Sequence, residues 1–183
     1  MTLISRNSMV AERQSSLRTA YAAKPERART VKWAATRNGE GVDAIHSVVE
    51  VGKGFGISHR YGIDAAVGGD HDLPNPGDAL CSALAVCADS TVRMVADVLG
   101  VPILDLRVEV QGEVDVRGCL AMGRDLKVGF RSMSCRIDLR VPPGTDPQRI
   151  AALRAQGERS CVNLDTLRSG VPVEVAFEVQ AGA

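Results

Sequence analysis

The stretch that decides the fold is residues 75–100, NPGDALCSALAVCADSTVRMVADVLG. Asn75-Pro76 predicts a helix start, because a proline at the first helical position lacks only an N–H that would have no partner there. Gly100 predicts the C-terminal cap. Between them, apolar residues recur at three- and four-residue spacing on two adjacent faces, and a helix that is apolar over so much of its girth is expected to be deeply buried. Cys87 is therefore predicted to lie on a core or interface face.

The segments on either side of this helix predict an α+β fold. Further helices are expected over residues 8–23, ended by Pro25, and over residues 147–159, after the helix-start residues Thr145 and Asp146. Alternating apolar residues and turn signals predict strands at 28–36, 43–51, 54–61, 103–116, 129–141 and 171–179. Arg37-Asn38-Gly39 is expected to form a hairpin turn between the first two strands. This order of elements favours a mainly antiparallel sheet.

Composition excludes several classes of function. The chain has 183 residues, enough for one substantial domain. Its 22 basic and 22 acidic residues leave no surplus that would favour nucleic acid or an anionic membrane as a partner. No run approaches the roughly 20 apolar residues of a membrane span, and the first residues lack the apolar core of a secretory signal, so we expect a cytoplasmic protein. Aromatic residues make up only 3%, and intertwining two chains would enlarge a core built from Val, Leu, Ala and Ile.

Five cysteines and three histidines are the candidates for chemistry. The odd cysteine count and irregular spacing are unlike a secreted disulfide framework. The sequence contains no CxxC pair, which argues against a tetracysteine zinc site, and the histidines are too dispersed to indicate a metal. No glycine-rich nucleotide motif follows a strand. We therefore expect no cofactor and no metal. In a reducing compartment, a functional thiol tends to be catalytic or redox-sensing.

Cys87 and Cys161 lie in settings that suit a peroxide-reducing thiol pair. Cys87 is inside the apolar helix, and Cys161 follows the helix expected at 147–159. In such a pair one thiolate attacks the peroxide and the other thiol resolves the sulfenic acid as a disulfide. This requires Cα atoms about 4.4–6.8 Å apart and a cation or donor beside the thiolate, which Arg37 on the predicted hairpin could supply. Simple packing is the alternative for the cysteines, and a surface turn position is the alternative for Arg37.

Taken together, these residues resemble the OsmC/Ohr family, the osmotically induced and organic hydroperoxide resistance proteins, over roughly residues 30–180. The resemblance rests on the order and spacing of Gly68-Gly69, Asn75-Pro76, Ala85-Val86-Cys87, Gly112-Glu113-Val114-Asp115, Cys161-Val162 and Gly170-Val171-Pro172-Val173. It implies an intertwined homodimer, in which antiparallel sheets wrap around two central helices and the active sites lie at the subunit interface. Residues 28–183 would form this OsmC-like domain, and residues 1–27 a helical N-terminal extension.

The resemblance also implies a thiol-dependent peroxidase that reduces organic hydroperoxides, and often hydrogen peroxide, with a dithiol reductant such as a lipoylated protein. By position, Cys87 would be the peroxidatic cysteine, Cys161 the resolving one and Arg37 the arginine that steadies the thiolate. The chain departs from the family where a glutamate often holds this arginine: it has Gly77 there, and the neighbouring Asp78 is the candidate substitute. A non-catalytic ligand-binding or redox-sensing protein on the same scaffold is the alternative.

Overall fold

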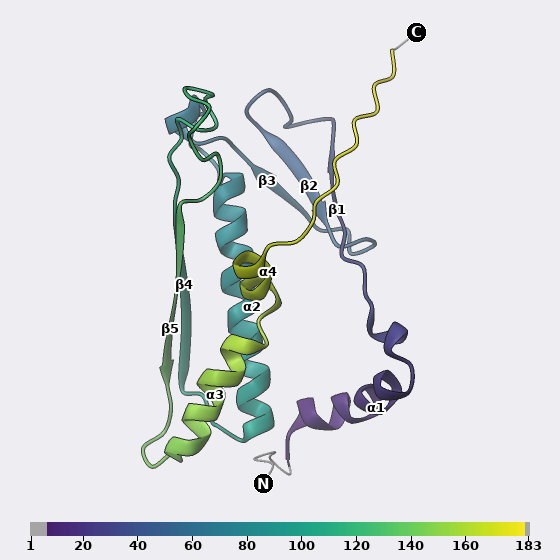
Figure 1. Ribbon diagram of the computed structural model, residues 1–183, viewed down its shortest axis with the longest axis vertical. Coiled ribbons are helices and arrows are strands. Elements are labelled where there is room, and N and C mark those ends of the chain that lie inside the picture. The colour runs from purple at the N-terminus through teal and green to yellow at the C-terminus, as the bar shows by residue number, and fades with distance from the viewer. Residues whose placement is uncertain (1–6, 182–183) are drawn as a thin grey trace.

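The computed structural model describes residues 7–181. Its α-helices are α1 (Met9–Ala23), α2 (Pro76–Leu99), α3 (Pro147–Arg159) and α4 (Val162–Ser169), with short 3-10 turns η1 (Pro25–Ala28) and η2 (Ala65–Val67). Its strands are β1 (Ala34–Arg37), β2 (Ser47–Val51), β3 (Ser58–Tyr61), β4 (Asp105–Glu113) and β5 (Ser132–Arg140). Helix α2 is the axis: the β4–β5 hairpin and α3–α4 pack along it, and the β1–β2–β3 sheet stands near its first turns (Figure 1). The predicted α+β class is confirmed.

Helix α2 begins and ends where the sequence predicts. The Asn75 side chain accepts the N–H groups of Gly77 and Asp78 at 2.7 and 3.1 Å. In return, the Asp78 carboxylate accepts the N–H of Asn75 at 2.9 Å, which completes a capping box. At the other end, Gly100 has a φ of 62°, the left-handed conformation that closes a helix. These local bonds fix the helix that carries Cys87.

By length and mean hydropathy alone, α2 could cross a membrane, which the sequence analysis did not anticipate. The core helix of a soluble protein meets the same condition. Helix α2 packs against β4, α3 and α4, and its buried residues are Leu84, Ala88, Thr91, Val92, Ala96 and Leu99. This packing covers one side of α2, whereas Val86 and Met94 on the rest of the helix are 64% and 43% exposed, so the deep burial expected from the sequence is only partly reached within one chain.

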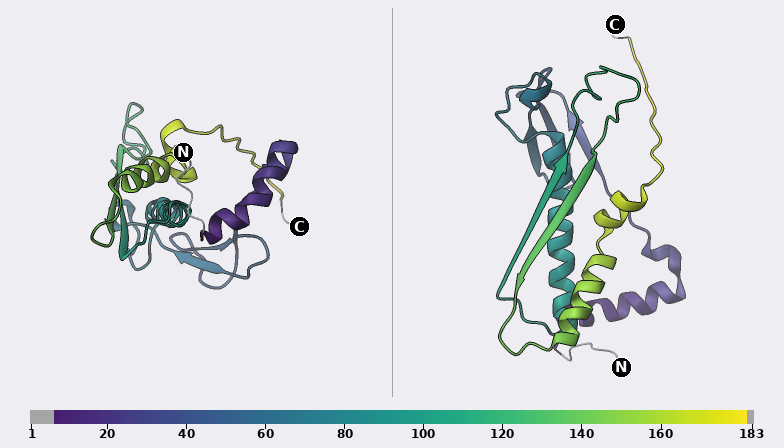
Figure 2. Two further views of the ribbon diagram at one scale, coloured as in Figure 1. Left: turned by 90° about the horizontal axis from the view of Figure 1, so that it is seen from below. Right: turned by 60° about the vertical axis from the view of Figure 1, so that its left-hand side comes forward.

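Two apolar clusters lie between α2 and its neighbours. One is centred on Leu153 of α3, which packs with Val92, Ala96, Leu99 and Val101. The other joins Leu84 and Ala88 of α2 to Cys161, and the inward side chains of β4 and β5 cover it. These strands pair in continuous antiparallel register from Asp105↔Arg140 to Glu113↔Ser132. The second cluster therefore brings the end of α3 and the start of α4 onto the turn of α2 that carries Cys87 (Figure 2, right).

The β1–β2–β3 sheet differs in detail from the prediction. Strand β1 begins only at Ala34, and its last residue Arg37 pairs with Val48, so no tight Asn-Gly hairpin forms. The loop between β1 and β2 is longer because local hydrogen bonds take the place of strand pairing there. The Asp43 carboxylate accepts the N–H groups of Ile45 and His46, both at 2.8 Å. Arg37 consequently lies at the end of a strand rather than in a turn.

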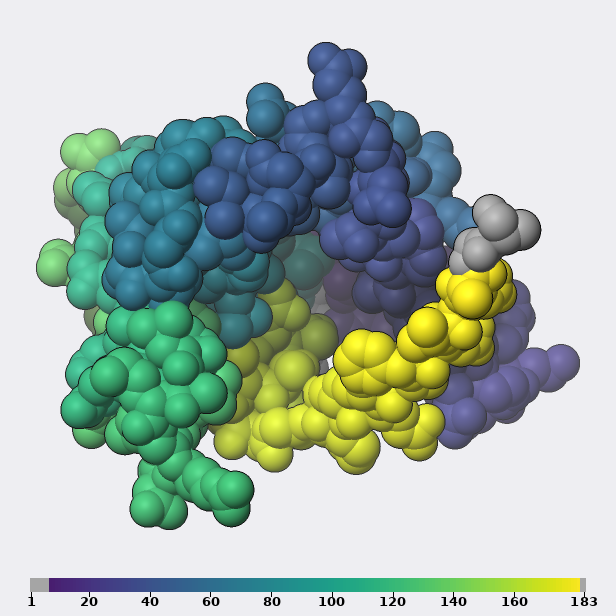
Figure 3. Space-filling view, turned by 90° about the horizontal axis from the view of Figure 1, so that it is seen from above, coloured from purple at the N-terminus to yellow at the C-terminus, as the bar shows by residue number. Residues whose placement is uncertain are grey.

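Residues 171–179 form no strand within this chain, although their alternating pattern predicts one. The segment leaves α4 as an extended tail with no backbone ladder (Figures 1 and 2). Its alternate apolar side chains are exposed: Val173 78%, Val175 74%, Phe177 91% and Val179 91%. Seen from above, the tail and the N-terminal arm lie on the same side of the molecule (Figure 3). The alternating pattern alone therefore does not make this segment a strand, because a strand also needs the hydrogen bonds of a neighbouring strand edge.

The N-terminal helix is anchored to the end of α2. The Ser8 side chain caps α1 by accepting the N–H of Ala11, and it donates to Asp97 at 2.5 Å. Asp97 also accepts the N–H of Val10 at 2.9 Å. The Ser8 hydroxyl and then this N–H lower the pKa of Asp97. The predicted helix at 8–23 is confirmed. Its first turn is held to Asp97 of α2 by these hydrogen bonds.

His46 clamps the loop before β2 to the loop before α2. Its Nδ1 lies 2.9 Å from Asp43 Oδ2 and its Nε2 lies 3.2 Å from Asp72 Oδ1, and its side chain is 15% exposed. The hydrogen bond with Asp43, followed by that with Asp72, raises the pKa of His46. The bond to His46 is also the largest cause that lowers the pKa of Asp43. The clamp is strongest when the imidazole is protonated between the two carboxylates.

We expect His46→Asn to remove a pH-dependent part of the stability. Because the folded state raises the pKa of His46, its contribution is full below the unfolded value of about 6.5 and is lost as the pH rises through the folded value. Urea unfolding at about pH 6 and about pH 8 checks this, since histidine titrates in that range. The wild type should exceed His46→Asn by more at the lower pH, whereas the exposed His59→Asn control should show no such difference. An equal gap at both pH values would contradict the prediction.

Candidate active site

Two thiols that lie far apart in the sequence meet beside α2. Cys161 Sγ lies 3.5 Å from Cys87 Sγ, with the Cys161 thiol as the donor, across 74 positions of the chain. Both cysteines are free. A disulfide would require the two sulfur atoms to close to about 2.05 Å. The geometry therefore presents a reduced pair already in contact.

The two thiols differ in access. Cys161 is 1% exposed and packs against Leu84 and Ala88, whereas Cys87 is partly exposed at the edge of the same cluster. Burial is the largest cause that raises the pKa of Cys161, and the hydrogen bond with Cys87 raises it further. Burial therefore favours the protonated form of Cys161, and Cys87 is the more exposed cysteine of the two.

Helix α4, which the sequence analysis did not predict, frames this pair. Cys161 is its N-cap residue. The Asn163 N–H donates to Cys87 Sγ at 3.5 Å, and the Asn163 side chain donates to the carbonyl of Ala83 at 2.8 Å. The Thr91 hydroxyl donates to the carbonyl of Cys87 at 2.7 Å. The only local signal for this helix was Gly170, a possible C-terminal cap for a segment poor in strong helix formers.

Arg37 and Asp78 do not lie at the thiols. Arg37 is exposed at the end of β1, and within residues 7–181 its side chain makes no ion pair or hydrogen bond to another side chain. Asp78 is committed to the capping box of α2. The structure thus brings Cys87 and Cys161 together and leaves the roles of Arg37 and Asp78 as predictions.

The space at Gly77 is already taken. A Cβ at this position would lie 2.9 Å from Asn75 Oδ1 and 3.5 Å from the Phe130 ring. The Asn75 oxygen is the one that caps α2. A side chain at position 77 would therefore have to displace the Asn75 cap, whereas the Phe130 ring is at an ordinary contact distance, which explains why glycine suits this site.

The remaining cysteines are apart from the pair or only border it. Burial raises the pKa of Cys81 and of Cys135, and Cys135 packs at the rim of the cluster that holds Cys161. Cys119 is exposed in the connection between β4 and β5 and donates to the Val116 carbonyl at 3.0 Å. Among the described residues, no group of three His, Cys, Asp or Glu side chains is placed to hold a metal ion.

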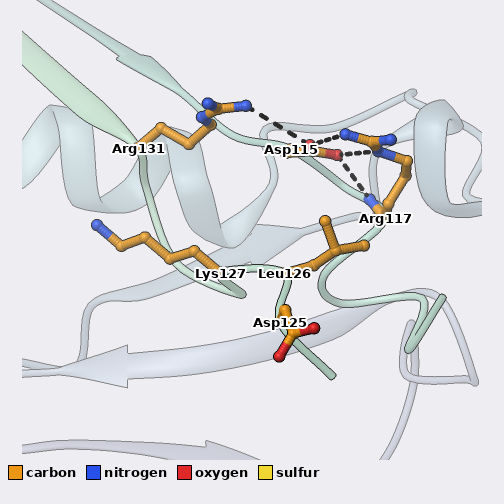
Figure 4. Close-up of a pocket in the computed structure, with 6 residues that line it drawn as sticks. All are labelled: Asp115, Arg117, Asp125, Leu126, Lys127 and Arg131. Atoms are coloured by element: carbon orange, nitrogen blue, oxygen red, sulfur yellow. Dashed lines mark hydrogen bonds and ion pairs between the residues drawn. The ribbon is translucent and has the colours of Figure 1, made fainter. Parts of the chain in front are cut away.

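A polar hollow of about 470 Å³ lies away from the thiols, in the connection between β4 and β5 (Figure 4). It is lined by Asp115, Arg117, Asp125, Leu126, Lys127 and Arg131. Asp115 pairs with Arg117 and Arg131, and the hydrogen bond from Arg117 is the largest cause that lowers the pKa of Asp115 to about 2. Asp115 holds the two arginines by ion pairs, and no cysteine lines the hollow, so the hollow is separate from the thiol site.

Comparison with solved structures shows the fold. The OsmC-like protein from Mycoplasma pneumoniae has a TM-score of 0.60 at 15% identity, covering 77% of this chain and 89% of that chain. An organic hydroperoxide resistance protein from Elizabethkingia anophelis has a TM-score of 0.55 at 15% identity, covering 79% and 92%. One from Legionella pneumophila has a TM-score of 0.54 at 18% identity, covering 77% and 91%.

A comparison with curated proteins finds no match. A family model described as OsmC-like protein, however, matches residues 69–176. This range is more than half of the chain, and it contains both Cys87 and Cys161. The chain therefore belongs to the OsmC-like family, and it shares its fold with organic hydroperoxide resistance proteins.

Proposed function

We propose that this protein is a thiol-dependent peroxidase that reduces organic hydroperoxides, and also hydrogen peroxide. The observation that carries the proposal is the 3.5 Å contact between the reachable sulfur of Cys87 and the buried thiol of Cys161. Two of the solved structures that share this fold are organic hydroperoxide resistance proteins. Hydroperoxides are therefore the first substrates to test.

In the first step, the Cys87 thiolate attacks the outer oxygen of the hydroperoxide. The S–O bond forms as the O–O bond breaks, and the alkoxide takes a proton and leaves as an alcohol. The sulfur is thereby oxidised to a sulfenic acid while the peroxide is reduced. Partial burial beside the apolar cluster favours an alkyl-bearing substrate at this sulfur.

In the second step, the Cys161 thiol attacks the sulfenic sulfur, the Cys87–Cys161 disulfide forms and water leaves. A dithiol such as a lipoylated protein then reduces this disulfide by thiol–disulfide exchange and is itself oxidised to a disulfide. No metal or organic cofactor enters this cycle. A cytoplasmic location fits it, because a reducing compartment keeps the pair in its thiol form.

The proposal includes a homodimer. The alternating side chains of residues 171–179 are exposed in a single chain, and so are Val86 of α2 at 64% and Met94 at 43%. A second copy supplies both a strand edge for the tail and an apolar face for α2. In this arrangement Arg37, which is exposed at the end of β1, would reach a thiolate only after two chains assemble, and Asp78 is the carboxylate proposed to hold it.

Exposing the reduced protein to one equivalent of cumene hydroperoxide tests the chemistry. We expect mass spectrometry of the peptides to show a Cys87–Cys161 disulfide and one equivalent of cumyl alcohol, because the two sulfur atoms are already in contact. The exposed Cys119 is the internal control and should stay reduced. Oxidation spread evenly over all five cysteines would reject the peroxidase proposal.

The second candidate is a non-catalytic ligand-binding or redox-sensing protein on the same scaffold. The crowded space at Gly77 favours it, because a glutamate at that position would have to displace the Asn75 oxygen that caps α2. This candidate predicts a slow disulfide that forms without turnover, or none at all. The same peptide analysis, repeated with an excess of dithiol and peroxide, separates it from a peroxidase by the amount of alcohol formed.

A further inference from the structure

The first turn of α4 lies against the sulfur of Cys87. Cys161 is the N-cap residue of this helix. The first N–H groups of a helix lack intrahelical partners, and one of them is turned to the thiol: the Asn163 N–H donates to Cys87 Sγ over 3.5 Å. Because the start of a helix carries partial positive charge, this contact favours a negative charge on the sulfur.

The side chain of Asn163 fixes that contact. Its Nδ2 donates to the Ala83 carbonyl at 2.8 Å. Ala83 lies four residues before Cys87, and in an α-helix its carbonyl accepts the N–H of that residue. The Asn163 amide therefore ties the start of α4 to the helical turn that carries Cys87.

The neighbouring thiol completes the surroundings of the sulfur. Cys161 donates its S–H to Cys87 Sγ at 3.5 Å. Since burial raises the pKa of Cys161, this thiol keeps its proton and acts as a donor. Cys87 thus faces two donors, and Asn163 positions one of them.

We propose that Asn163 is a positioning residue for the attacking thiol: its side chain clamps α4 on α2, and its backbone N–H thereby stabilises the Cys87 thiolate. This inference rests on the proposed function because it concerns the same thiolate. Its test, however, needs no peroxide. In the single chain Asn163 contacts the sulfur, whereas Arg37 makes no bond to it within the described residues.

The test is the alkylation rate of Cys87 by iodoacetamide in fully reduced protein, followed by peptide mass spectrometry at about pH 7 and about pH 10, below and above the usual ionisation of a thiol. For Asn163→Ala we expect the rate at the lower pH to fall about fivefold, the size of one neutral hydrogen bond, because loss of the bond to Ala83 frees the N–H that faces Cys87 to move away. The rate at the higher pH should change little, because about pH 10 lies above the usual ionisation of a thiol. For Asn163→Asp, which loses the amide donor and adds a carboxylate, the alkylation rate at the lower pH should fall further.

The matched control is Val162→Ala, on the same turn of α4 and 70% exposed, which should alkylate like the wild type. An unchanged rate for Asn163→Ala at the lower pH overturns the proposal. So does a rise at both pH values, which would mean that Asn163 only tightens the packing and restricts access. If the rate falls as expected in a protein that forms no alcohol from cumene hydroperoxide, the peroxidase proposal fails and the role of Asn163 stands.

Discussion

Replacing Cys87 with serine is expected to lower hydroperoxide consumption to the uncatalysed rate, because the attacking thiolate is lost. Replacing Cys161 with serine has a different expected result: one equivalent of alcohol forms, and the sulfenic acid on Cys87 then stays unresolved. The difference follows from access, since Cys161 is 1% exposed and touches Cys87 from the buried side. Peroxide consumption over time, with dimedone labelling of the sulfenic acid by mass, measures both results.

Cys119→Ser is the control for these variants. Cys119 is exposed and its thiol donates only to the nearby Val116 carbonyl among the described residues, so its loss should leave turnover unchanged. Full and equal activity in the Cys87 and Cys161 variants would reject the two-cysteine mechanism. Loss of activity in Cys119→Ser would place the chemistry elsewhere.

Placing charges on the C-terminal tail is expected to split the proposed dimer. Val175→Lys with Phe177→Asp alters two side chains that are 74% and 91% exposed in the single chain, so the fold of one chain should be untouched. Burial of such side chains against a partner contributes about 1.5–3 kcal/mol each, and burial of unpaired charges opposes it. Light scattering should give twice the mass of one chain for the wild type and the mass of one chain for the variant.

The control for the tail variant is Met122→Lys, which adds a charge at a side chain that is 68% exposed in the connection between β4 and β5. It should remain dimeric. A wild-type mass equal to one chain would contradict the homodimer. A variant that stays dimeric would show that the tail does not hold the two copies together.

The helices that carry their own end signals could be predicted from the sequence. Asn75-Pro76 and Gly100 give the bounds of α2, and Asp146 before Pro147 gives the start of α3. Each signal acts through hydrogen bonds or backbone angles within a few residues. The position of Cys87 on a half-buried face of α2 follows from the same local pattern.

Helix α4 and the tail could not be predicted in this way. The residues of α4 have modest helix propensity, and the helix is held by contacts such as Leu164 against the cluster of Cys161 and by the Asn163 bond to Ala83. The tail has the alternation of a strand, but a strand forms only where another strand edge accepts its hydrogen bonds. Both outcomes depend on surfaces remote in the sequence.

The amino-acid order alone was sufficient for the class of fold and for the ends of α2, because caps and apolar periodicity are local. The roles of Cys87 and Cys161 in catalysis stay a prediction. The meeting of those cysteines 74 residues apart, the exposed place of Arg37 and the use of Asp78 as a cap ligand required the folded chain. The reason is that these positions depend on how α3 and α4 pack on α2, which joins segments far apart in the chain. No single segment of the sequence specifies all of those contacts.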